Sequence, residues 1–362
     1  MAPRSLLLII LVVFCSKITA FQCNNKNKFS YPNLFPAILI FGDSTVDTGN
    51  NNYIPTVFKG NHPPYGDDFP GQVPTGRFSN GKLVPDFLAS MFCLKETIPP
   101  FLTPNLPDKE LLTGVSFASA GSGIDELTTA VSKVIPVSRQ TEYLKEYIHR
   151  LTRIVGKKQA QKIVSEALVI ISAGTNDFIF NFYDVPTRRL QFSVYEYQDY
   201  LQSKLTKFIK ELYDLGCRRM VVSGLPPIGC LPIQLTLKLS ILRKCVPMEN
   251  LDSLSYNTKL VKLLPRIQQT LPGSKLFYAD SYNRLLDMIK YPRKYGFVET
   301  SKGCCGTGTV EAGPLCNHLT PVCGNASEFI FWDSIHPGES VYRYLTEQLV
   351  KDLLPYFKPK AV

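Results

Sequence analysis

The sequence predicts an α/β protein, a three-layer α/β/α sandwich around a central, mostly parallel sheet. Short aliphatic and β-branched runs alternate with longer amphipathic stretches, which is typical of strands joined by crossover helices. The short runs are apolar almost throughout, as in strands that are covered on both faces. Hydrophobic residues make up 44% of the 362 residues, which is enough for a sizeable core.

Five short apolar runs are expected to form the strands of this sheet. The run at 167–171 is the clearest of them, and the run at 115–118 is the weakest because it contains small and polar residues. The expected strands, in chain order, are 37–41, 115–118, 167–171, 219–222 and 275–278.

Five amphipathic stretches are expected to be helices. In the last of them Val341, Leu345 and Leu349 recur on one face at helical spacing. The stretch 60–81 is rich in Pro and Gly and is expected to be a long surface loop within the same domain. The expected helices are 82–92, 140–155, 195–215, 251–271 and 338–356.

The N-terminus predicts secretion. Arg4 precedes an apolar run at 6–15, and Ala20 is a small residue before a plausible cleavage point, so residues 1–20 have the pattern of a signal peptide. The alternative is a buried N-terminal helix or strand. The run is too short to span a bilayer comfortably, and no transmembrane segment is expected elsewhere. Residues 21–362 are then expected to form one extracellular domain.

Cysteine usage agrees with an oxidising compartment. Ten Cys occur, and nine remain after a cut near residue 20. Cys230 and Cys245 bracket one loop, and four further cysteines cluster near the C-terminus; such groups predict disulfides. We expect two disulfides within the cluster, or one within it and one reaching outside it, with the adjacent members bonded to different partners. The odd count leaves a free thiol, for which Cys217 is the candidate. The clustered cysteines are Cys304, Cys305, Cys316 and Cys323.

Charge and motif content argue against several classes of ligand. Lys and Arg number 40 and Asp and Glu 30, a formal charge of +10 that is dispersed in small pairs, which is a poor match to a nucleic-acid reader. Cys316, His318 and Cys323 raise a metal site as an alternative, but their spacing matches no usual zinc pattern. The stretch 76–83 resembles the sequence motif of a phosphate-binding loop, but Leu83 stands where that motif has the Ser or Thr whose hydroxyl binds magnesium. We therefore expect no metal and no cofactor.

Polar residues follow the strand candidates, at the edge where open α/β sheets bind ligands. Ser44 follows the first strand, Gly121 the second and Asn176 the third, while Asp333 and His336 stand near the C-terminus. Taken singly, each has an ordinary structural role, such as a helix cap or a turn. Together they supply a nucleophile, a base with its orienting carboxylate, and oxyanion donors, which are the groups that acyl transfer needs.

The blocks that hold these residues resemble the plant GDSL esterase/lipase family of SGNH hydrolases, in its extracellular-lipase-like branch. The matches run from residue 37 to 345 in the family's order, with Ser116 where the family often has Asn. The resemblance implies a flavodoxin-like SGNH hydrolase fold and no cofactor. The blocks are FGDSTVDTGNNN from Phe41, VSFASAG from Val115, GTND from Gly174 and DSIHP from Asp333.

The resemblance implies a secreted esterase or lipase with a serine nucleophile. Ser44 would attack an ester carbonyl, His336 would accept its proton, and Asp333 would orient the imidazole. The amides of Ser44 and Gly121 and the side chain of Asn176 would form the oxyanion hole. A parallel strand leading into a helix is expected to place Ser44 at a helix N-terminus. No Gly-x-Ser-x-Gly elbow occurs, so an ordinary α/β-hydrolase is disfavoured.

Other functions and features remain open at this stage. An acyltransferase of the same fold, or a catalytically silent extracellular binding or coat protein, is the alternative to an esterase. Asn325 begins the only Asn-x-Ser/Thr sequon and is expected to carry an N-glycan. The positive charge suggests loose association with acidic cell-wall polymers. Four aromatic residues after Asn176 either line an acyl pocket or belong to the core, namely Phe178, Phe180, Phe182 and Tyr183.

Overall fold

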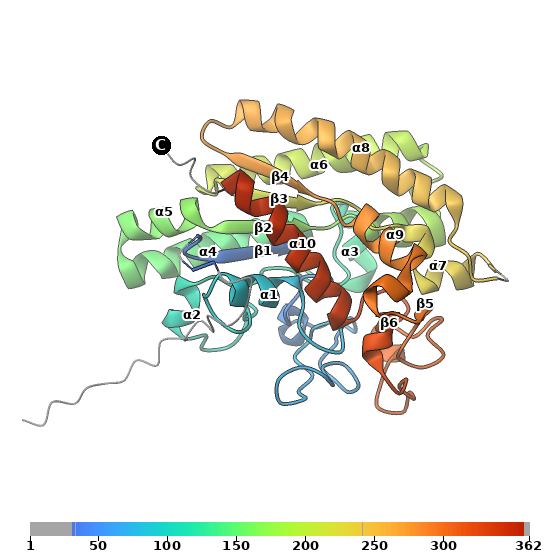
Figure 1. Ribbon diagram of the computed structural model, residues 1–362. Helices are drawn as coiled ribbons and strands as arrows, with labels where there is room; N and C mark the ends of the chain where they lie inside the picture. The colour runs from blue at the N-terminus through green and yellow to red at the C-terminus, as the bar shows by residue number, and fades with distance from the viewer. Residues whose placement is uncertain (1–30, 33, 241, 358–362) are drawn as a thin grey trace, which may run out of the picture.

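The central sheet has four parallel strands. The computed structural model describes residues 31–357 except 33 and 241, so the expected signal peptide at 1–20 lies outside the described residues. The strand order follows the chain, and four of the five expected strands are found within one residue of their expected ends (Figure 1). The strands are β1 (Ile38–Gly42), β2 (Leu168–Ser172), β3 (Arg219–Ser223) and β4 (Lys275–Ala279).

The weakest strand candidate extends the sheet on the far side of β1. Ile40 forms a parallel bridge with Ser116, and the backbone N–H of Phe117 donates to the carbonyl oxygen of Ile40 at 2.7 Å. Counted with this segment, the five strands lie in the order 2-1-3-4-5, which is the flavodoxin-like order. The segment at 115–118 therefore lies on one side of β1, and β2 lies on the other. In such sheets the ligand crevice is expected at the carboxyl end of the strand between them, which here is β1.

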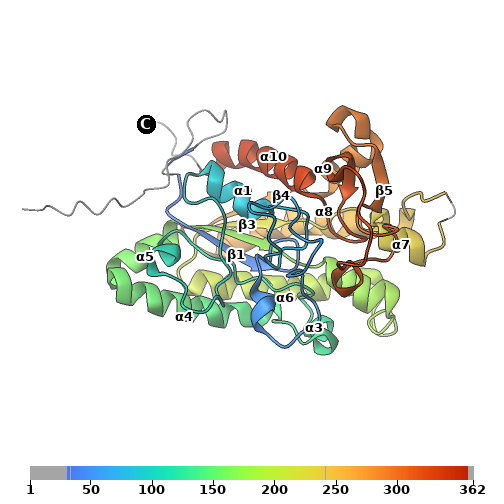
Figure 2. The ribbon, with the colours of Figure 1, turned by 90° about the horizontal axis from the view of Figure 1, so that it is seen from below.

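Helices cover both faces of the sheet (Figures 1 and 2). Leu39 and Phe41 pack among the helices of one face, whereas Ile38 and Ile40 pack against those of the other. Successive side chains of a strand point to opposite faces, so strands buried on both sides read as unbroken apolar runs. The first face carries α4 (Val137–Val155), α5 (Lys157–Glu166), α6 (Val194–Asp214) and α8 (Pro247–Thr270). The opposite face carries α1 (Val84–Met91) and α10 (Glu339–Phe357).

Short helices and a second, small sheet complete the fold. The short helices are α2 (Asp108–Leu112), α3 (Glu126–Ser132), α7 (Pro232–Leu237) and α9 (Tyr282–Lys290). A π-type helix (Asp177–Asp184) follows β2, and a two-stranded sheet pairs β5 (Glu299–Gly303) with β6 (Phe329–Phe331). Within the described residues, no helix has both the length and the apolar character needed to cross a membrane. Of all these helices, the sequence predicted α1, α4, α6, α8 and α10.

The chain after β1 does not enter an α-helix, so the expectation that Ser44 stands at a helix N-terminus is wrong. The backbone N–H of Asp47 donates to the carbonyl oxygen of Asp43 at 3.0 Å, and this makes a single turn. The Asp47 carboxylate then accepts the N–H of Gly49 at 2.8 Å, and the 3₁₀-helix Asn50–Tyr53 follows. This side-chain bond competes with helix continuation, as Asp side chains do in turns.

Three disulfides agree with the expected pattern. The adjacent cysteines of the C-terminal cluster have different partners, and both bonds stay within the cluster. Cys316 and Cys323, which had suggested a metal site, are therefore taken up in disulfides. Cys217 is buried and is the free thiol of the described residues. The disulfides are Cys230–Cys245, Cys304–Cys323 and Cys305–Cys316.

Candidate active site

Ser44, His336 and Asp333 form a continuous hydrogen-bonded line, which we call the triad. Nε2 of His336 is 2.7 Å from Oγ of Ser44, although the two residues are 292 positions apart. Nδ1 of the same ring is 2.7 Å from Oδ2 and 2.9 Å from Oδ1 of Asp333. All three side chains are buried. This is the geometry of a nucleophile, a general base and an orienting carboxylate.

A bend between β6 and α10 positions the acid and the base. Oδ1 of Asp333 accepts the backbone N–H groups of Ile335 at 2.8 Å and His336 at 2.7 Å. The N–H of Trp332 donates to the carbonyl oxygen of His336 at 2.8 Å and closes the bend. The Asp333 carboxylate thus holds the backbone of its own loop and also contacts the imidazole of His336. Asp333 and His336 are three positions apart, and this bend brings their side chains together without a helix.

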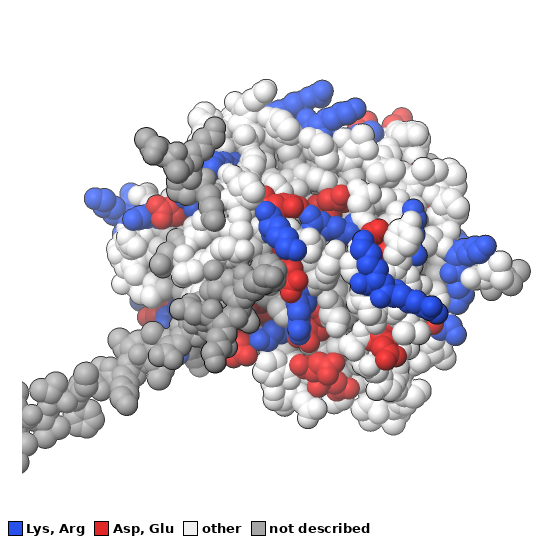
Figure 3. All heavy atoms as spheres, viewed as in Figure 1, with Lys and Arg blue, Asp and Glu red and all other residues white. Residues whose placement is uncertain are grey.

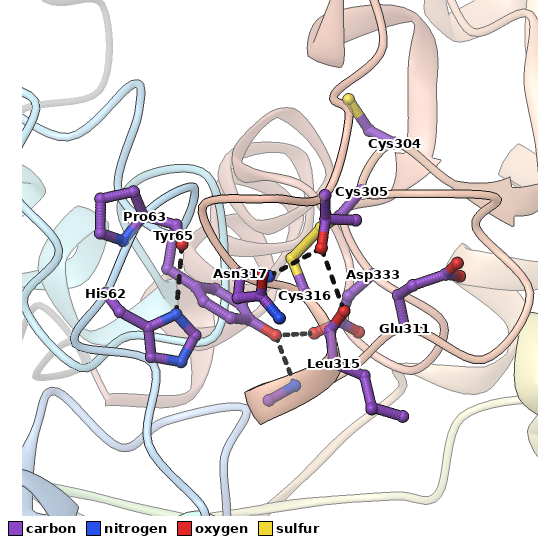
Figure 4. The surroundings of a disulfide bond; sticks show 12 residues. His62, Pro63, Tyr65, Cys304, Cys305, Glu311, Leu315, Cys316, Asn317 and Asp333 are labelled. Carbon is purple, nitrogen blue, oxygen red and sulfur yellow. Dashed lines mark hydrogen bonds between the residues drawn. A yellow bond between two sulfur atoms is a disulfide. The ribbon is translucent and has the colours of Figure 1, made fainter.

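Tyr65 is a member of the site that the sequence analysis missed. Its hydroxyl donates to Oδ2 of Asp333 at 2.7 Å and accepts the backbone N–H of Gly313 at 2.7 Å (Figure 4). The side chain is fully buried, and burial together with the charge of Asp333 raises the pKa of Tyr65 well above its usual value. Tyr65 comes from the Pro- and Gly-rich stretch 60–81, which we had expected to be a long surface loop.

Three hydrogen-bond donors border a small cavity of about 60 Å³ beside the triad, which we call the oxyanion cavity. Ser44, Gly121 and Asn176 line it together with His336. One N–H of the Asn176 side chain donates to the carbonyl oxygen of Ser122 at 2.8 Å, which orients the amide and leaves its second N–H available. Within the described part of the chain, the backbone N–H groups of Ser44 and Gly121 have no hydrogen-bond acceptor.

The block that contains Ser44 also builds the loop that contains Gly121. The side chain of Asn50 donates to the carbonyl oxygens of Ser116 and Ala118, both at 2.8 Å. Oδ2 of Asp47 accepts the N–H of Ala120 at 2.9 Å, and burial raises the pKa of this carboxyl to about 6. The polar residues after Ser44 therefore hold the neighbouring strand end in register with the nucleophile.

Gly42 and Gln140 secure the end of β1 immediately before the site. The Gln140 side chain bonds both backbone groups of Gly42, donating to its carbonyl oxygen and accepting its N–H, each at 2.8 Å. Gly42 has φ +138°, and a Cβ there would lie 1.9 Å from the carbonyl oxygen of Ser172. Only glycine allows the two backbones to lie this close. The chain that leads to Ser44 is therefore held firmly at the end of β1.

Two buried carboxyl groups flank the candidate site without joining the triad. Asp43 accepts the backbone N–H of Thr45 at 3.0 Å and its hydroxyl at 2.7 Å, and burial raises the pKa of Asp43 to about 6. Asp177 accepts the N–H groups of Ile124 and Asp125, both at 2.9 Å, and burial raises the pKa of Asp177 to about 7. Both groups hold loops in place on either side of the oxyanion cavity.

The aromatic residues after Asn176 divide between core and cavity. Phe178, Phe182 and Tyr183 belong to the main hydrophobic core, whereas Phe180 lines the oxyanion cavity. This helix is of the π type, so its residues do not repeat at the usual α-helical spacing. Spacing in the sequence therefore could not tell which of the four aromatic residues face the core and which faces the cavity.

Comparison with known proteins identifies the family. The GDSL-like Lipase/Acylhydrolase family model matches residues 38–349. Three proteins of Arabidopsis thaliana, each named a GDSL esterase/lipase, are similar over most of their length. One is 58% identical over 327 residues, which are 90% of this chain and 91% of the relative. A second is 57% identical with the same coverage, and a third is 46% identical over 350 residues, 95% of this chain and 97% of the relative. The chain therefore belongs to the GDSL-like lipase/acylhydrolase family and is an esterase/lipase of the hydrolase class.

Proposed function

We propose that this protein is a secreted serine esterase that hydrolyses carboxylic esters through an acyl-enzyme on Ser44. The observation that carries the proposal is the unbroken line from Oγ of Ser44 through the imidazole of His336 to the carboxylate of Asp333. A buried serine that is hydrogen-bonded to a ring nitrogen, whose other nitrogen bonds a carboxylate, is an activated nucleophile.

Each residue of the site has one task in the proposed reaction. Oγ of Ser44 attacks the ester carbonyl while Nε2 of His336 takes the hydroxyl proton, and Asp333 stabilises the resulting imidazolium. The negative charge on the carbonyl oxygen is stabilised by the N–H groups of Ser44 and Gly121 and by the side-chain amide of Asn176. His336 then gives its proton to the leaving alcohol, and the acyl group stays on Ser44.

Water completes the cycle by the same steps in reverse. His336 takes a proton from the water, the hydroxide attacks the acyl-enzyme, and Ser44 recovers its proton as the carboxylic acid leaves. An acyltransferase uses the same acyl-enzyme with an alcohol in place of water. The intact Ser44–His336 hydrogen bond favours either of these enzymes over a silent binding or coat protein, because binding alone needs no activated serine.

The variant His336→Gln tests the proposal. It should fold normally and lose about 10⁴- to 10⁶-fold in kcat on p-nitrophenyl acetate, since the serine would lack its base. His149→Gln is the matched control, because it makes the same change on the exposed side of α4. Turnover in His336→Gln equal to that of the wild type would remove the catalytic assignment.

Two measurements separate hydrolysis from the alternatives. An organophosphonate should label the wild-type protein at Ser44, and mass spectrometry should find the adduct on the peptide that contains it. Product analysis in the presence of a small alcohol then distinguishes free acid from a new ester. Labelling without turnover would leave a transferase or an esterase of narrow specificity, whereas absence of both labelling and turnover would support the silent binding protein.

Secretion and modification belong to the same proposal. The signal-peptide pattern at 1–20 and the three disulfides support export, and N-terminal sequencing of the secreted protein should begin near Phe21. Asn325 is exposed and precedes the 3₁₀-helix Ala326–Glu328. A mass that drops on treatment with a glycan-removing enzyme, but not in Asn325→Gln, would establish the glycan. Residues 21–362 are proposed to form one domain.

The surface charge argues against a nucleic-acid ligand. Basic and acidic side chains are interspersed on the face that carries α10 (Figure 3). A mixed surface of this kind lacks the single-sign stripe of nucleic-acid readers. Loose attraction of the positively charged protein to acidic cell-wall polymers remains part of the proposal, and it predicts retention on a pectin column that declines with added salt.

A further inference from the structure

Exposed apolar side chains gather around the end of α7 and the outer face of α8. Seven of the nineteen large hydrophobic side chains that are exposed in the described residues lie between positions 237 and 261. Exposed apolar residues are ordinary where they are scattered singly, but a concentration of them marks a surface that binds a partner. We call this surface the α7–α8 patch. Its members are Leu237, Leu239, Leu242, Met248, Leu251, Leu254 and Val261.

The patch has two parts that the fold holds side by side. One part is the turn that follows α7, which projects from the body of the molecule (Figures 1 and 2). The other part is the outer face of α8, where Met248, Leu251 and Leu254 recur at intervals of three residues, as neighbours on one side of a helix do. Nζ of Lys238 is 3.6 Å from Oε1 of Glu249, and this contact joins the turn to the first part of α8.

The turn presents its leucines on a fixed backbone. The hydroxyl of Ser240 donates to the carbonyl oxygen of Lys244 and accepts its N–H, both at 2.9 Å, and the Cys230–Cys245 disulfide closes the base of the turn. Leu239 has φ +51°, a left-handed conformation that a leucine rarely adopts. Leu239 and Leu242 are nevertheless 83% and 73% exposed. The described part of the chain therefore holds these two side chains in place without covering them.

The unpaired charges around the patch are positive. Between positions 237 and 262 neither of the two acidic side chains is exposed, because Glu249 is buried and Asp252 is half-buried and accepts a hydrogen bond from Tyr183 at 2.9 Å. Lys244 and Lys262 are exposed, and within the described residues they have no ion pair. Figure 3 shows basic side chains beside the projecting turn. The patch thus combines apolar side chains with free positive charge.

We propose that the α7–α8 patch docks the protein on a lipid surface that carries acidic headgroups. Apolar side chains flanked by cations match both layers of such a surface, since the leucines enter the boundary with the acyl chains while the cations stay beside the headgroups. A lipid layer closes around a projecting turn, whereas a protein partner would need a matching groove. The inference goes beyond the proposed function, because it does not depend on Ser44 as a nucleophile.

A second copy of the chain fits the patch less well than a lipid surface does. A symmetric pair places the same surface on both sides of the contact. The free charges of Lys244 and Lys262 would then face like charges, with no exposed carboxylate of the patch between them, and such a contact is unfavourable.

Helix α7 joins the patch to the bend that carries the triad's acid and base. The backbone N–H of Ile233 donates to the carbonyl oxygen of Ser334 at 2.9 Å, and Ser334 lies between Asp333 and His336 in the chain. Leu237, the first residue of the patch, follows Ile233 by one helical turn in a helix of six residues, which is about 9 Å long. Docking through the patch therefore holds this bend close to the lipid layer.

Sedimentation with vesicles tests the docking without any need for catalysis. The vesicles consist of ether-linked phosphatidylcholine, either alone or with ether-linked phosphatidylglycerol added, and they contain no carboxylic ester that the protein could cleave. The wild-type protein should bind the acidic vesicles at least about fivefold more tightly than the neutral ones. Added salt should weaken the binding to the acidic vesicles, because it screens the attraction of the cations to the headgroups.

Matched variants separate the contribution of the leucines from that of the charge. Leu239→Ser/Leu242→Ser should weaken binding to the acidic vesicles by at least about tenfold. Leu190→Ser/Leu319→Ser is the control, because these leucines are 83% and 81% exposed outside the patch, and it should bind as the wild type does. Lys244→Glu should weaken binding to the acidic vesicles by at least about fivefold and leave binding to the neutral ones unchanged.

A tryptophan placed in the patch reports insertion directly. Trp332 is the only native tryptophan and is buried, so its emission should not respond to vesicles. The emission of Leu239→Trp should shift to the blue on binding and be quenched by brominated lipids, whereas Leu190→Trp should show neither change. Leu239→Trp also keeps the test decisive if the serine variants do not fold.

The outcomes separate failure of the docking from failure of the proposed function. Absence of vesicle binding by the wild type, or equal binding of Leu239→Ser/Leu242→Ser and wild type, overturns the docking. Binding that depends on charge alone, with Leu239→Trp unquenched, shows adsorption without insertion and also overturns it. A dimer that Leu239→Ser/Leu242→Ser dissociates, in a protein that binds no vesicles, assigns the patch to a second copy and overturns it too. A protein that binds through its leucines but cleaves no ester overturns the proposed function alone.

Discussion

The hydroxyl of Tyr65 donates a 2.7 Å hydrogen bond to Oδ2 of Asp333 across 268 positions of the chain. The same oxygen accepts the N–H of Gly313, which lies in the loop that the Cys305–Cys316 disulfide closes. Two segments remote in sequence thus meet at the carboxylate that orients His336. Tyr65 does not touch the serine or the imidazole through any hydrogen bond described here, so we regard it as a positioning residue.

Tyr65→Phe should lower kcat by about tenfold with KM nearly unchanged. A hydrogen bond to a charged group contributes about 1.5–3 kcal/mol, and here part of that free energy holds the carboxylate in the orientation that the imidazole needs. Steady-state kinetics on a short p-nitrophenyl ester measures the split between kcat and KM. Tyr195→Phe, at an exposed position of α6, is the matched control. Equal kcat in Tyr65→Phe and wild type would show that the bond is only structural.

Asn176→Ala should reduce kcat by about 10²- to 10³-fold, because the transition state loses one oxyanion donor. KM should change much less, since the uncharged ester carbonyl depends less on that donor. The side chain also bonds the carbonyl oxygen of Ser122, so thermal unfolding should be measured in parallel. If Asn176→Ala raises KM and leaves kcat intact, the residue binds substrate and is not part of the oxyanion hole.

Asp43→Asn should change how stability depends on pH. Burial raises the pKa of Asp43 to about 6 in the folded protein, whereas an unfolded Asp ionises near pH 3.9. Between these values the folded protein keeps a proton that the unfolded chain loses, so this group's contribution to the free energy of unfolding is full below about pH 4 and falls as the pH rises. The total loss is about 3 kcal/mol and is complete by about pH 7.

Asn does not titrate, and its side-chain oxygen can still accept both bonds from Thr45. The stability of Asp43→Asn relative to the wild type should therefore increase by about 2 kcal/mol between pH 4 and pH 6.5 and then stay nearly constant. Urea unfolding of both proteins at several pH values measures the difference between their free energies of unfolding. Other carboxyl groups titrate in both proteins, so their contributions cancel in this difference. A difference that does not vary with pH would contradict the raised pKa.

Loss of the Cys305–Cys316 disulfide should impair catalysis as well as stability. The double variant Cys305→Ser/Cys316→Ser should lose about 2–4 kcal/mol of stability and also several-fold in kcat at a temperature where it is fully folded. The catalytic loss is expected because Gly313 would no longer be held against Tyr65.

Removing the Cys230–Cys245 disulfide provides the comparison. That bond spans 15 residues, against 11 for Cys305–Cys316, so the expected loss of stability is similar. It does not touch the Tyr65–Asp333 contact, and kcat should stay within about twofold. Equal catalytic losses in the two double variants would mean that general loosening, and not the contact at Asp333, limits the rate.

The strands could be predicted because both of their faces are buried. An unbroken apolar run needs no knowledge of its neighbours to be recognised, and even the weak candidate at 115–118 was placed correctly. The polar blocks could be placed at the sheet edge for the same reason, since parallel strands bring their carboxyl ends together. The triad's proximity was inferred from chemistry and resemblance, and the geometry agrees with it.

Contacts between loops could not be predicted in this way. Tyr65 reaches Asp333 from a stretch without periodicity, and Gln140 reaches Gly42 from the start of a long helix. Neither pairing has a local pattern that distinguishes it from an ordinary surface residue. The expected helix at Ser44 failed because the Asp47 side chain takes the backbone N–H groups that follow the turn. Sequence periodicity carries no information on such side-chain competition.

The distance in sequence between Ser44 and His336 has a consequence for how the protein is made. While a ribosome is adding the residues that follow β4, the serine and both oxyanion loops already exist, but the imidazole has yet to be synthesised. A nascent or prematurely terminated chain therefore lacks the base, however well its sheet has formed. Under the proposed mechanism, ester cleavage therefore becomes possible only when translation is almost finished.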